Sequence, residues 1–227
     1  MATGSSILRR ILFNVSEDRY FCSHRLDFAR TLVAEGFEVF LATKVSSYHD
    51  LIERSGIKVI NLDYERRRFN PIAELRTLKN LAKVIQQVNP VIIHNVGIKL
   101  IIYGSLSAYF HRSAKIINTF SGLGWAFTSS GQGRFFLRYV LQSSLRILVR
   151  GGRVCNIFQN PDDLRLLQQS QVTSYLNSEV IFGGVGVDTN MYKPRCSVSS
   201  KLIVMHVSRL LKDKGIFEFI EAASYLK

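Results

Sequence analysis

The stretch that decides the fold is residues 71–94, PIAELRTLKNLAKVIQQVNPVIIH. Pro71 fits the first turn of a helix, where a missing N–H costs nothing, and apolar residues recur at helical spacing over 72–88. Asn89-Pro90 ends this helix, and the β-branched run 91–94 that follows predicts a buried strand. A helix that leads directly into a buried strand is the repeating unit of an α/β fold.

The same alternation of short apolar runs and longer amphipathic segments continues along the chain. The predicted strands are 11–15, 38–43, 58–62, 91–94, 115–119, 154–159 and 180–183. A second clear helical pattern covers 24–36, where Gly36 predicts a C-terminal cap. Strands separated by helices pair in parallel through right-handed crossovers. We therefore predict an α/β fold with a Rossmann-like open parallel sheet and helices on both faces.

A change of composition divides the chain near its C-terminal end. Residues 193–200, KPRCSVSS, predict a linker between a first domain, 1–192, and a second unit, 201–227. This unit offers one strand, 202–207, and one helix, 215–226, and such a pair cannot bury its apolar residues alone. We expect it to be the truncated start of a second domain.

The charge balance favours anionic partners. The 227 residues include 30 Lys and Arg against 17 Asp and Glu, which gives a formal net charge of +13. An acidic membrane, a phosphorylated small molecule and nucleic acid all fit this excess, but nucleic acid has only the charge in its favour, so we expect none. Cys22, Cys155 and Cys196 are too far apart for a redox pair or a zinc ribbon. Neither a signal peptide nor a spanning helix is predicted, so we expect a cytoplasmic chain.

Two glycine-containing segments follow predicted strands. Residues 183–188, GGVGVD, lack the G-x-G-x-x-G spacing of dinucleotide-binding proteins, which disfavours a nicotinamide or flavin enzyme. Gly184, Gly186 and Asp188 are expected in a loop that faces a cleft, and a turn that requires glycine at positive φ is the alternative.

Residues 121–133, SGLGWAFTSSGQG, mix glycine with aromatic and hydroxyl side chains. Loops at the carboxyl ends of parallel strands line ligand crevices, so this segment predicts a sugar-binding loop. The alternative is an ordinary surface loop whose Trp125 and Phe127 pack on the next helix.

Basic residues cluster at several places. Arg134, Arg138, Arg146 and Arg150 border an apolar face of the predicted helix 133–150, which suits a membrane surface or, alternatively, a largely buried helix with solvated arginines. Clusters at 66–68 and 9–10 suit phosphate groups or solvent. In the segment 208–215, SRLLKDKG, Arg209 and Lys214 flank a predicted helix N-terminus, whose dipole favours an anion such as a diphosphate.

In this order, these segments resemble the retaining glycosyltransferases of family 4, which have the GT-B fold. The resemblance rests on 21–26, 38–43, His94 with Lys99, Tyr103 and Gly104, 122–129, 158–163, 184–194 and 208–215. It covers essentially the whole chain and points to bacterial members that assemble polysaccharides and lipid-linked oligosaccharides.

The resemblance implies two Rossmann-like domains about a cleft, the first for an acceptor and the second for a nucleotide-sugar, commonly a UDP-sugar. Arg209 and Lys214 would hold the donor diphosphate and neutralise the leaving group, so no metal or other cofactor is expected. The residues expected to contact a saccharide or polyprenyl-diphosphate-linked acceptor are Ser23, Gly122, Gly124, Trp125 and Thr128. His94 and His24, each near the carboxyl end of a predicted strand, are the candidates for proton transfer.

We therefore expect a fragment of a sugar-transferring enzyme of cell-surface glycan assembly, peripheral on the inner face of the plasma membrane. Residues 1–227 alone are expected to be inactive, because most donor contacts would be missing. Two alternatives remain open. One is a non-catalytic subunit of a split glycosyltransferase that binds acceptor or membrane, and the other is a GT-B-like sugar-nucleotide epimerase.

Overall fold

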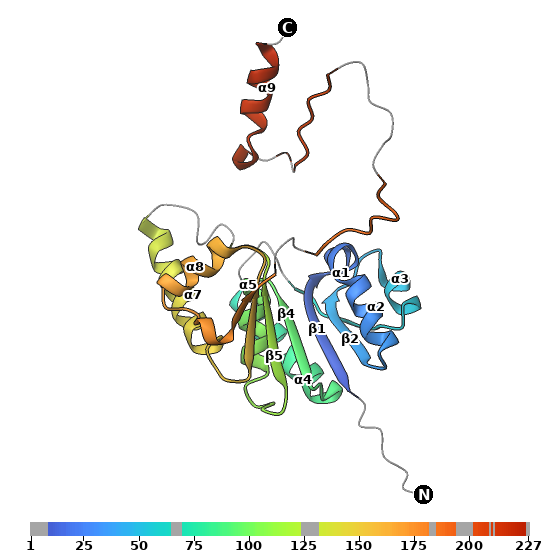
Figure 1. The fold of residues 1–227 in the computed structure, drawn as a ribbon. Helices are drawn as coiled ribbons and strands as arrows, with labels where there is room; N and C mark the ends of the chain where they lie inside the picture. Colours follow the sequence, from blue (N-terminus) through green and yellow to red (C-terminus); the bar gives the residue numbers. More distant parts are fainter. Residues whose placement is uncertain are drawn as a thin grey trace, which may run out of the picture. The chain divides into compact units, whose positions relative to one another are not determined.

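A computed structural model describes residues 9–64, 70–123, 132–181, 185–193, 202–208, 210 and 212–225 (Figure 1). The chain divides into two compact units, Met1–Gly186 and Val187–Lys227. The first unit contains the β-sheet and most of the helices.

The sheet of the first unit has seven parallel strands in the order β3-β2-β1-β4-β5-β6-β7. The strands are β1 (Arg10–Glu17), β2 (Glu38–Lys44), β3 (Lys58–Asn61), β4 (Ile92–Val96), β5 (Lys115–Phe120), β6 (Val154–Phe158) and β7 (Ser178–Val180). The predicted Rossmann-like open sheet is thus confirmed. The direction in which strands are added reverses between β1 and β4, and such a switch point leaves a crevice at the carboxyl ends of the strands.

Helices connect the strands. They are α1 (Asp18–His24), α2 (Leu26–Ala34), α3 (His49–Arg54), α4 (Pro71–Val88), α5 (Ile98–Ser107), α7 (Gln132–Leu148) and α8 (Pro161–Gln169). Helix α4 has the predicted bounds, because the Asn70 side chain caps its first N–H groups and Asn89 ends it with φ at +48°. The pattern at 24–36 contains the end of one helix and the whole of another, since α1 ends at His24 and α2 begins at Leu26.

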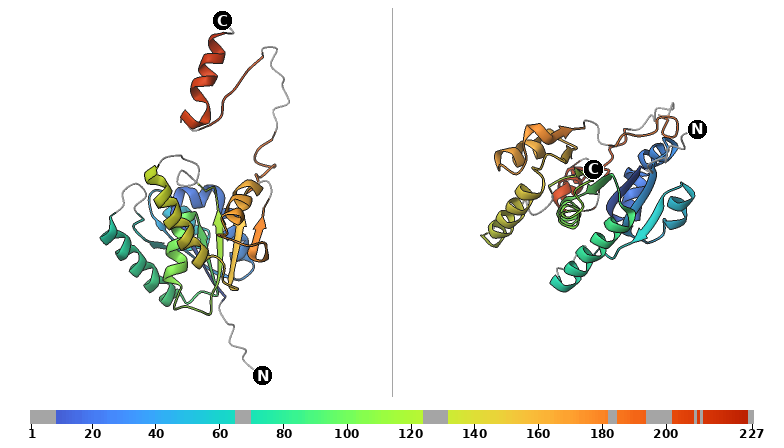
Figure 2. Two further views of the ribbon diagram at one scale, coloured as in Figure 1. Left: turned by 90° about the vertical axis from the view of Figure 1, so that its left-hand side faces the viewer. Right: turned by 90° about the horizontal axis from the view of Figure 1, so that it is seen from below.

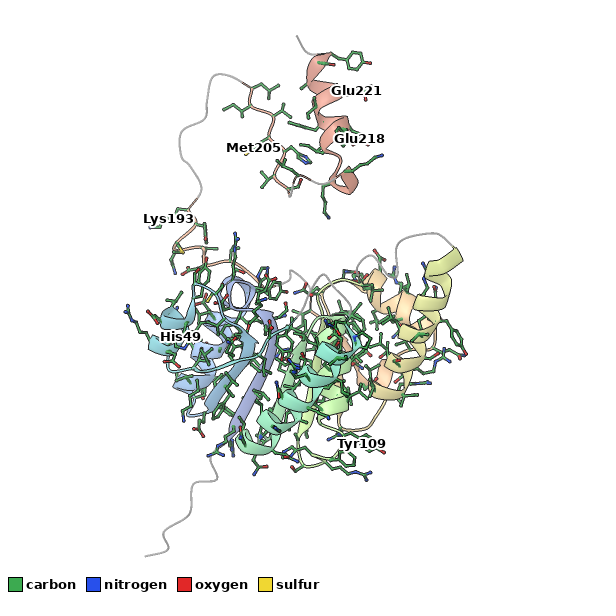
Figure 3. The ribbon with its side chains drawn as sticks, turned by 180° about the vertical axis from the view of Figure 1, so that it is seen from behind. His49, Tyr109, Lys193, Met205, Glu218 and Glu221 are labelled. Atoms are coloured by element: carbon green, nitrogen blue, oxygen red, sulfur yellow. The ribbon has the colours of Figure 1, made fainter. Side chains whose placement is uncertain are left out.

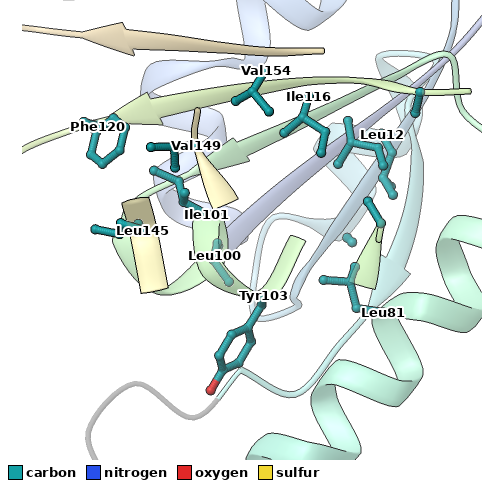
Figure 4. Packing of buried hydrophobic residues seen from close by; sticks show 14 of the residues in the cluster. Leu12, Leu81, Leu100, Ile101, Tyr103, Ile116, Phe120, Leu145, Val149 and Val154 are labelled. Atoms are coloured by element: carbon teal, nitrogen blue, oxygen red, sulfur yellow. The ribbon is translucent and has the colours of Figure 1, made fainter. Parts of the chain in front are cut away.

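The two faces of the sheet are covered differently. On one face α4, α5 and α7 lie side by side, and their apolar residues pack on the strands (Figures 2 and 4). Leu81, Ile101 and Leu145 represent the three helices in this core. On the other face the helical residues of the core come from α1, α2 and α3, which cover the side of β1 and β2. The far half of this face, over β5 and β6, is only partly buried.

The second unit contains a 3-10 turn, η2 (Lys212–Lys214), and helix α9 (Ile216–Ser224). The predicted helix at 215–226 is therefore present, but the predicted strand at 202–207 is wrong for the described structure. A strand needs a neighbour for its backbone hydrogen bonds, and this segment has none among the described residues. Leu202 is accordingly 93% exposed, and α9 buries none of its residues. The predicted linker lies almost entirely outside the described residues.

Candidate active site

A cavity of about 210 Å³ lies at the carboxyl ends of β1 and β4, where the strand order reverses. We call it the switch-point cavity. Its lining residues are Ser16, Tyr20, Tyr64, Val96, Gly97, Ile98, Lys99, Leu100 and Ser121. The wall thus combines two tyrosine rings, two serine hydroxyls, one ammonium group and the first residues of α5. The sequence placed a ligand site at this edge of the sheet, but it did not identify most of these residues.

The amino-terminal end of α5 forms one wall of the cavity. Gly97 precedes the helix with φ at +89°, a backbone conformation that favours glycine, and its N–H donates to the carbonyl of Thr119 at 3.0 Å. The first N–H groups of a helix have no acceptor within the helix, and the helix dipole makes this end positive. This wall therefore favours anionic or hydrogen-bond-accepting groups.

Lys99 is held at the cavity by a partly buried ion pair. Its Nζ lies 2.8 Å from Oε1 of Glu74, which belongs to α4, and 5.3 Å from the centre of the Tyr103 ring. The Tyr103 hydroxyl donates to the other oxygen of Glu74. Burial, and then this carboxylate, raise the pKa of Tyr103. Glu74 is 7% exposed, and the hydrogen bond from Tyr103 holds its carboxylate in place. This buried carboxylate fixes the position of the Lys99 ammonium group.

Four buried asparagines form a row across the sheet, which we call the asparagine ladder. Asn14, Asn95, Asn118 and Asn156 face one another in register on β1, β4, β5 and β6. Each Nδ2 donates to the next Oδ1, at 3.0, 3.0 and 3.2 Å along the row. At one end the hydroxyl of Tyr64 donates to Oδ1 of Asn14. The ladder therefore positions one of the tyrosines that line the switch-point cavity.

The ladder requires a glycine on the helix that packs against it. A Cβ atom on Gly104 would lie 1.8 Å from Oδ1 and 2.4 Å from Cγ of Asn95. Only glycine allows α5 to approach so closely. In the sequence, Gly104 stood out only by resemblance, together with Lys99 and Tyr103. The ladder was not predicted, because its only signal was an asparagine inside or near several predicted strands.

Asp18 fixes the helix that carries Tyr20. Its carboxylate accepts hydrogen bonds from Oγ and the N–H of Ser46, both at 2.6 Å, and from the N–H groups of Tyr48 and Arg19 at 3.2 and 2.7 Å. Burial raises the pKa of this carboxyl, but the hydrogen bonds together lower it by more, so the group is ionised. The first turn of α1 is thereby tied to the loop after β2.

His24 and Ser23 lie on α1 beside the cavity. The His24 ring stacks on Tyr20 with a centroid distance of 4.3 Å, and its Nδ1 lies 2.6 Å from Oγ of Ser23. Both side chains are exposed. Their predicted roles in proton transfer and acceptor binding stay predictions, now with Tyr20 as the link to the cavity.

His94 lies elsewhere. It is in the middle of β4, not at its carboxyl end, and it points to the face opposite Asn95, where its ring centroid lies 5.1 Å from that of Phe13. Its Nε2 lies 2.8 Å from Oγ1 of Thr119. Burial, with a smaller effect of the nearby Arg25 charge, lowers its pKa to about 3. The imidazole is therefore neutral near pH 7, and its catalytic role stays a prediction.

His94 lines a second cavity, of about 240 Å³, which we call the apolar groove. Its lining residues are Ile11, Phe13, Arg25, Phe28, Leu32, Ile92, His94, Ile117, Thr119, Ile157 and Ile181. The structure thus places His24 beside one cavity and His94 in another.

The remaining predicted site residues are distributed over both units. Gly122 has φ at +121° and follows Ser121 of the switch-point cavity. Gly186 has φ at +73°, and Asp188 accepts a hydrogen bond from the N–H of Asn190 at 2.8 Å. Lys214 is exposed and directly precedes Gly215, the N-cap residue of α9. The predicted residues Gly124, Trp125, Thr128, Gly184 and Arg209 lie outside the described residues.

Two of the basic clusters have structural partners. Arg10 donates to Glu38 and to the carbonyl of Val88, and Arg146 donates to carbonyls at the end of α8. In the part of the chain that the structure describes, no group of three or more His, Cys, Asp or Glu side chains could hold a metal ion. Within the same residues, no helix has both the length and the apolar character needed to cross a bilayer.

The strand order and the cavity at the switch point define a Rossmann-like domain with a ligand crevice at the carboxyl ends of its strands. The family model described as glycosyl transferase 4-like matches residues 10–150, and the chain therefore belongs to the glycosyl transferase 4-like family.

A curated relative is the N,N'-diacetylbacillosaminyl-diphospho-undecaprenol alpha-1,3-N-acetylgalactosaminyltransferase of Campylobacter jejuni, which is 24% identical over 216 residues. The match covers 89% of this chain and 57% of that protein. A glycosyltransferase from Rickettsia africae shares the fold with a TM-score of 0.65 and 18% identity, over 96% of this chain and 57% of that one. HepE of Anabaena, solved with UDP-glucose, has a TM-score of 0.55 and 15% identity, over 82% of this chain and 46% of that one. The chain thus spans about half the length of these relatives.

Proposed function

We propose that this chain is the acceptor-binding part of a glycosyltransferase, followed by the start of its donor-binding part. The enzyme transfers a sugar, with retention at the anomeric carbon, from a nucleotide-sugar to a saccharide or lipid-linked acceptor in cell-surface glycan assembly. The observation that carries the proposal is the switch-point cavity in a member of the glycosyl transferase 4-like family. The name of the Campylobacter relative supports a lipid-diphosphate-linked acceptor, and HepE with UDP-glucose supports a UDP-sugar donor.

The groups in the switch-point cavity match the chemistry of such an acceptor. Tyr20 and Tyr64 offer ring faces and hydroxyls to a sugar, as Ser16 and Ser121 offer hydroxyls. Lys99 and the positive end of α5 suit the adjacent diphosphate. An acceptor that carries a sugar on a diphosphate presents both kinds of group.

For the chemical step, Arg209 and Lys214 would neutralise the charge that develops on the nucleoside diphosphate as its bond to the sugar breaks. Lys214 is exposed at the start of α9, in keeping with this role. Of the two histidines, His24 is the better placed to exchange a proton with an acceptor, because it is exposed, whereas His94 is buried and its pKa of about 3 makes it a weak base. We place the enzyme in the cytoplasm, peripheral to the inner face of the plasma membrane, where a lipid-linked acceptor presents its head group.

Calorimetric titration of the 227-residue chain with a water-soluble, short-chain polyprenyl-diphospho-N-acetylhexosamine tests the proposal. We expect binding, and we expect Tyr20→Ala to weaken it about tenfold, which corresponds to the loss of one ring contact of about 1.4 kcal/mol. Tyr109→Ala is the matched control, because Tyr109 is 55% exposed and follows α5 at the opposite edge of the sheet (Figure 3). This variant should bind like the wild type.

Three outcomes would contradict the proposal in different ways. If the acceptor does not bind, or if Tyr20→Ala binds it as tightly as the wild type, the switch-point cavity is not the acceptor site. Conversion of a UDP-sugar to its isomer without an acceptor would identify an epimerase. A stable stoichiometric complex with a separate donor-binding chain would identify a split enzyme.

A further inference from the structure

The outer face of α4 carries a continuous stripe of exposed side chains. Ile72 is 73% and Leu75 is 54% exposed, and Arg76, Lys79 and Lys83 are exposed as well. Their spacing of three and four residues places them on one side of the helix, and we call them the α4 stripe. The apolar residues occupy the first turns, and the cations follow.

No carboxylate on α4 compensates these cations. The acidic residue of the helix, Glu74, is buried on the opposite side and is paired with Lys99. None of the ion pairs found among the described residues involves Arg76, Lys79 or Lys83. The stripe therefore presents three positive charges without an ion pair among the described residues, next to exposed aliphatic groups, on a chain whose formal net charge is +13.

The apolar end of the stripe lies close to the switch-point cavity. Glu74 belongs to the same first turns of α4 as Ile72 and Leu75, and its carboxylate contacts the Lys99 ammonium group, which lines the cavity. The body of α4 and its ion pair with Lys99 thus lie between the exposed aliphatic residues and the cavity wall. A surface bound by the stripe would lie beside the cavity.

We propose that the α4 stripe docks on an anionic phospholipid bilayer. Ile72 and Leu75 enter the interfacial region, and Arg76, Lys79 and Lys83 lie on the head groups. A bilayer fits better than nucleic acid, because single-stranded nucleic acid is bound by aromatic stacking and the stripe has aliphatic residues instead. The benefit, a lipid-linked acceptor delivered beside the cavity, rests on the proposed function, whereas the docking itself does not.

Vesicle co-flotation of the 227-residue chain tests this surface without donor or acceptor, so its result is independent of the proposed sugar transfer. The vesicles contain phosphatidylcholine alone or phosphatidylcholine mixed with phosphatidylglycerol. We expect binding to the mixed vesicles only, with a strong decrease at high salt. Each cation near an anionic surface is worth about fivefold in affinity, so Arg76→Glu with Lys79→Glu and Lys83→Glu should weaken binding at least about a hundredfold. Ile72→Ser with Leu75→Ser should weaken it about tenfold.

The matched control changes the same net charge elsewhere, with Arg54→Glu, Arg112→Glu and Lys115→Glu. These residues are exposed and lie outside α4. The control should retain most of the binding, and circular dichroism melting should show that all variants are folded. Equal loss in the control, equal binding to neutral vesicles, or wild-type binding by the α4 variant would overturn the proposal. Loss of RNA binding but not of vesicle binding in the α4 variant would assign the stripe to nucleic acid and would overturn it too.

Discussion

The two faces of β4 and β5 differ in a way that residue polarity alone does not explain. On one face Asn95 and Asn118 are polar, yet they are completely buried beneath α5 in the asparagine ladder. On the other face Ile117 is apolar, yet it is only partly buried and lines the apolar groove. Ile117 and Asn118 are neighbours on β5 and point to opposite faces, so these adjacent residues differ in burial.

This difference shows on which side of the sheet buried hydrogen bonds fix the strand register. Each ladder asparagine is satisfied by its neighbours, and a buried amide that loses its partner is costly, so the ladder fixes the register of four strands. On the groove side, Ile117 and Ile157 are only partly buried and make apolar contacts. The switch-point cavity lies on the side of the sheet that carries the ladder, since the ladder holds Tyr64, and α4 and α5 hold Lys99.

Among the substitutions that test this difference between the two faces, we expect Gly104→Ala to cause the largest loss of stability. The new Cβ would overlap the Asn95 side chain, whose oxygen would lie only 1.8 Å away, and would break its hydrogen bonds. We expect a loss of about 3 to 5 kcal/mol in the free energy of unfolding, well above the roughly 1 kcal/mol by which alanine favours a helix. Urea denaturation measures it. In Gly151→Ala the Cβ would meet Val154 at an ordinary 3.7 Å, so this control should change little.

Adjacent residues of β5 give the next largest effect. Asn118→Ala leaves the amide of Asn95 and the oxygen of Asn156 without their ladder partners, so we expect a loss of about 2 to 4 kcal/mol. Ile117→Ala, on the groove side, should cost about 1 kcal/mol, because the side chain is only partly buried. Urea denaturation of both variants would reveal the order, and a larger loss for Ile117→Ala would show that the ladder contributes less than the groove.

Within one pH unit below 6.5, the pH dependence of stability provides the smallest effect. The pKa of His94 is about 3 in the folded chain, and the ordinary histidine value of 6.5 applies to the unfolded chain. As the pH falls below 6.5, the unfolded chain therefore binds this proton before the folded chain does. Stability from the neutral imidazole is therefore complete above pH 6.5 and decreases toward pH 3, by up to about 1.4 kcal/mol per pH unit. His94→Gln should flatten the profile of unfolding free energy just below pH 6.5. Parallel profiles for the two proteins would show that His94 titrates normally.

The fold could be predicted from the sequence because it depends on periodic patterns. The helix Pro71–Val88 has a proline at its start, an apolar stripe and an Asn-Pro end, and all three signals are local. The asparagine ladder could not be predicted in this way. It depends on the register of β1, β4, β5 and β6, and a single sequence does not report register directly.

The sequence predicted where a candidate site would lie better than it predicted which residues would line it. The loop after β5 was predicted to bind a sugar, and its Ser121 lines the switch-point cavity, with Gly122 next to it, so this role stays a prediction. Tyr20, Tyr64 and Glu74 were missed because their roles arise from contacts between distant segments. The apparent strand at 202–207 was wrong because β-branched residues form a strand only when a neighbouring strand accepts their hydrogen bonds.

The most direct test of the account is an NMR titration of the isotope-labelled chain with the short-chain polyprenyl-diphospho-N-acetylhexosamine. We predict that the largest amide shifts occur at Ser16, Tyr20, Gly97, Lys99 and Ser121, around the switch-point cavity. If the largest shifts instead occur at Arg25, His94 and Ile157, the acceptor binds in the apolar groove. That result would contradict the claim that the acceptor binds in the switch-point cavity, on the ladder side of the sheet.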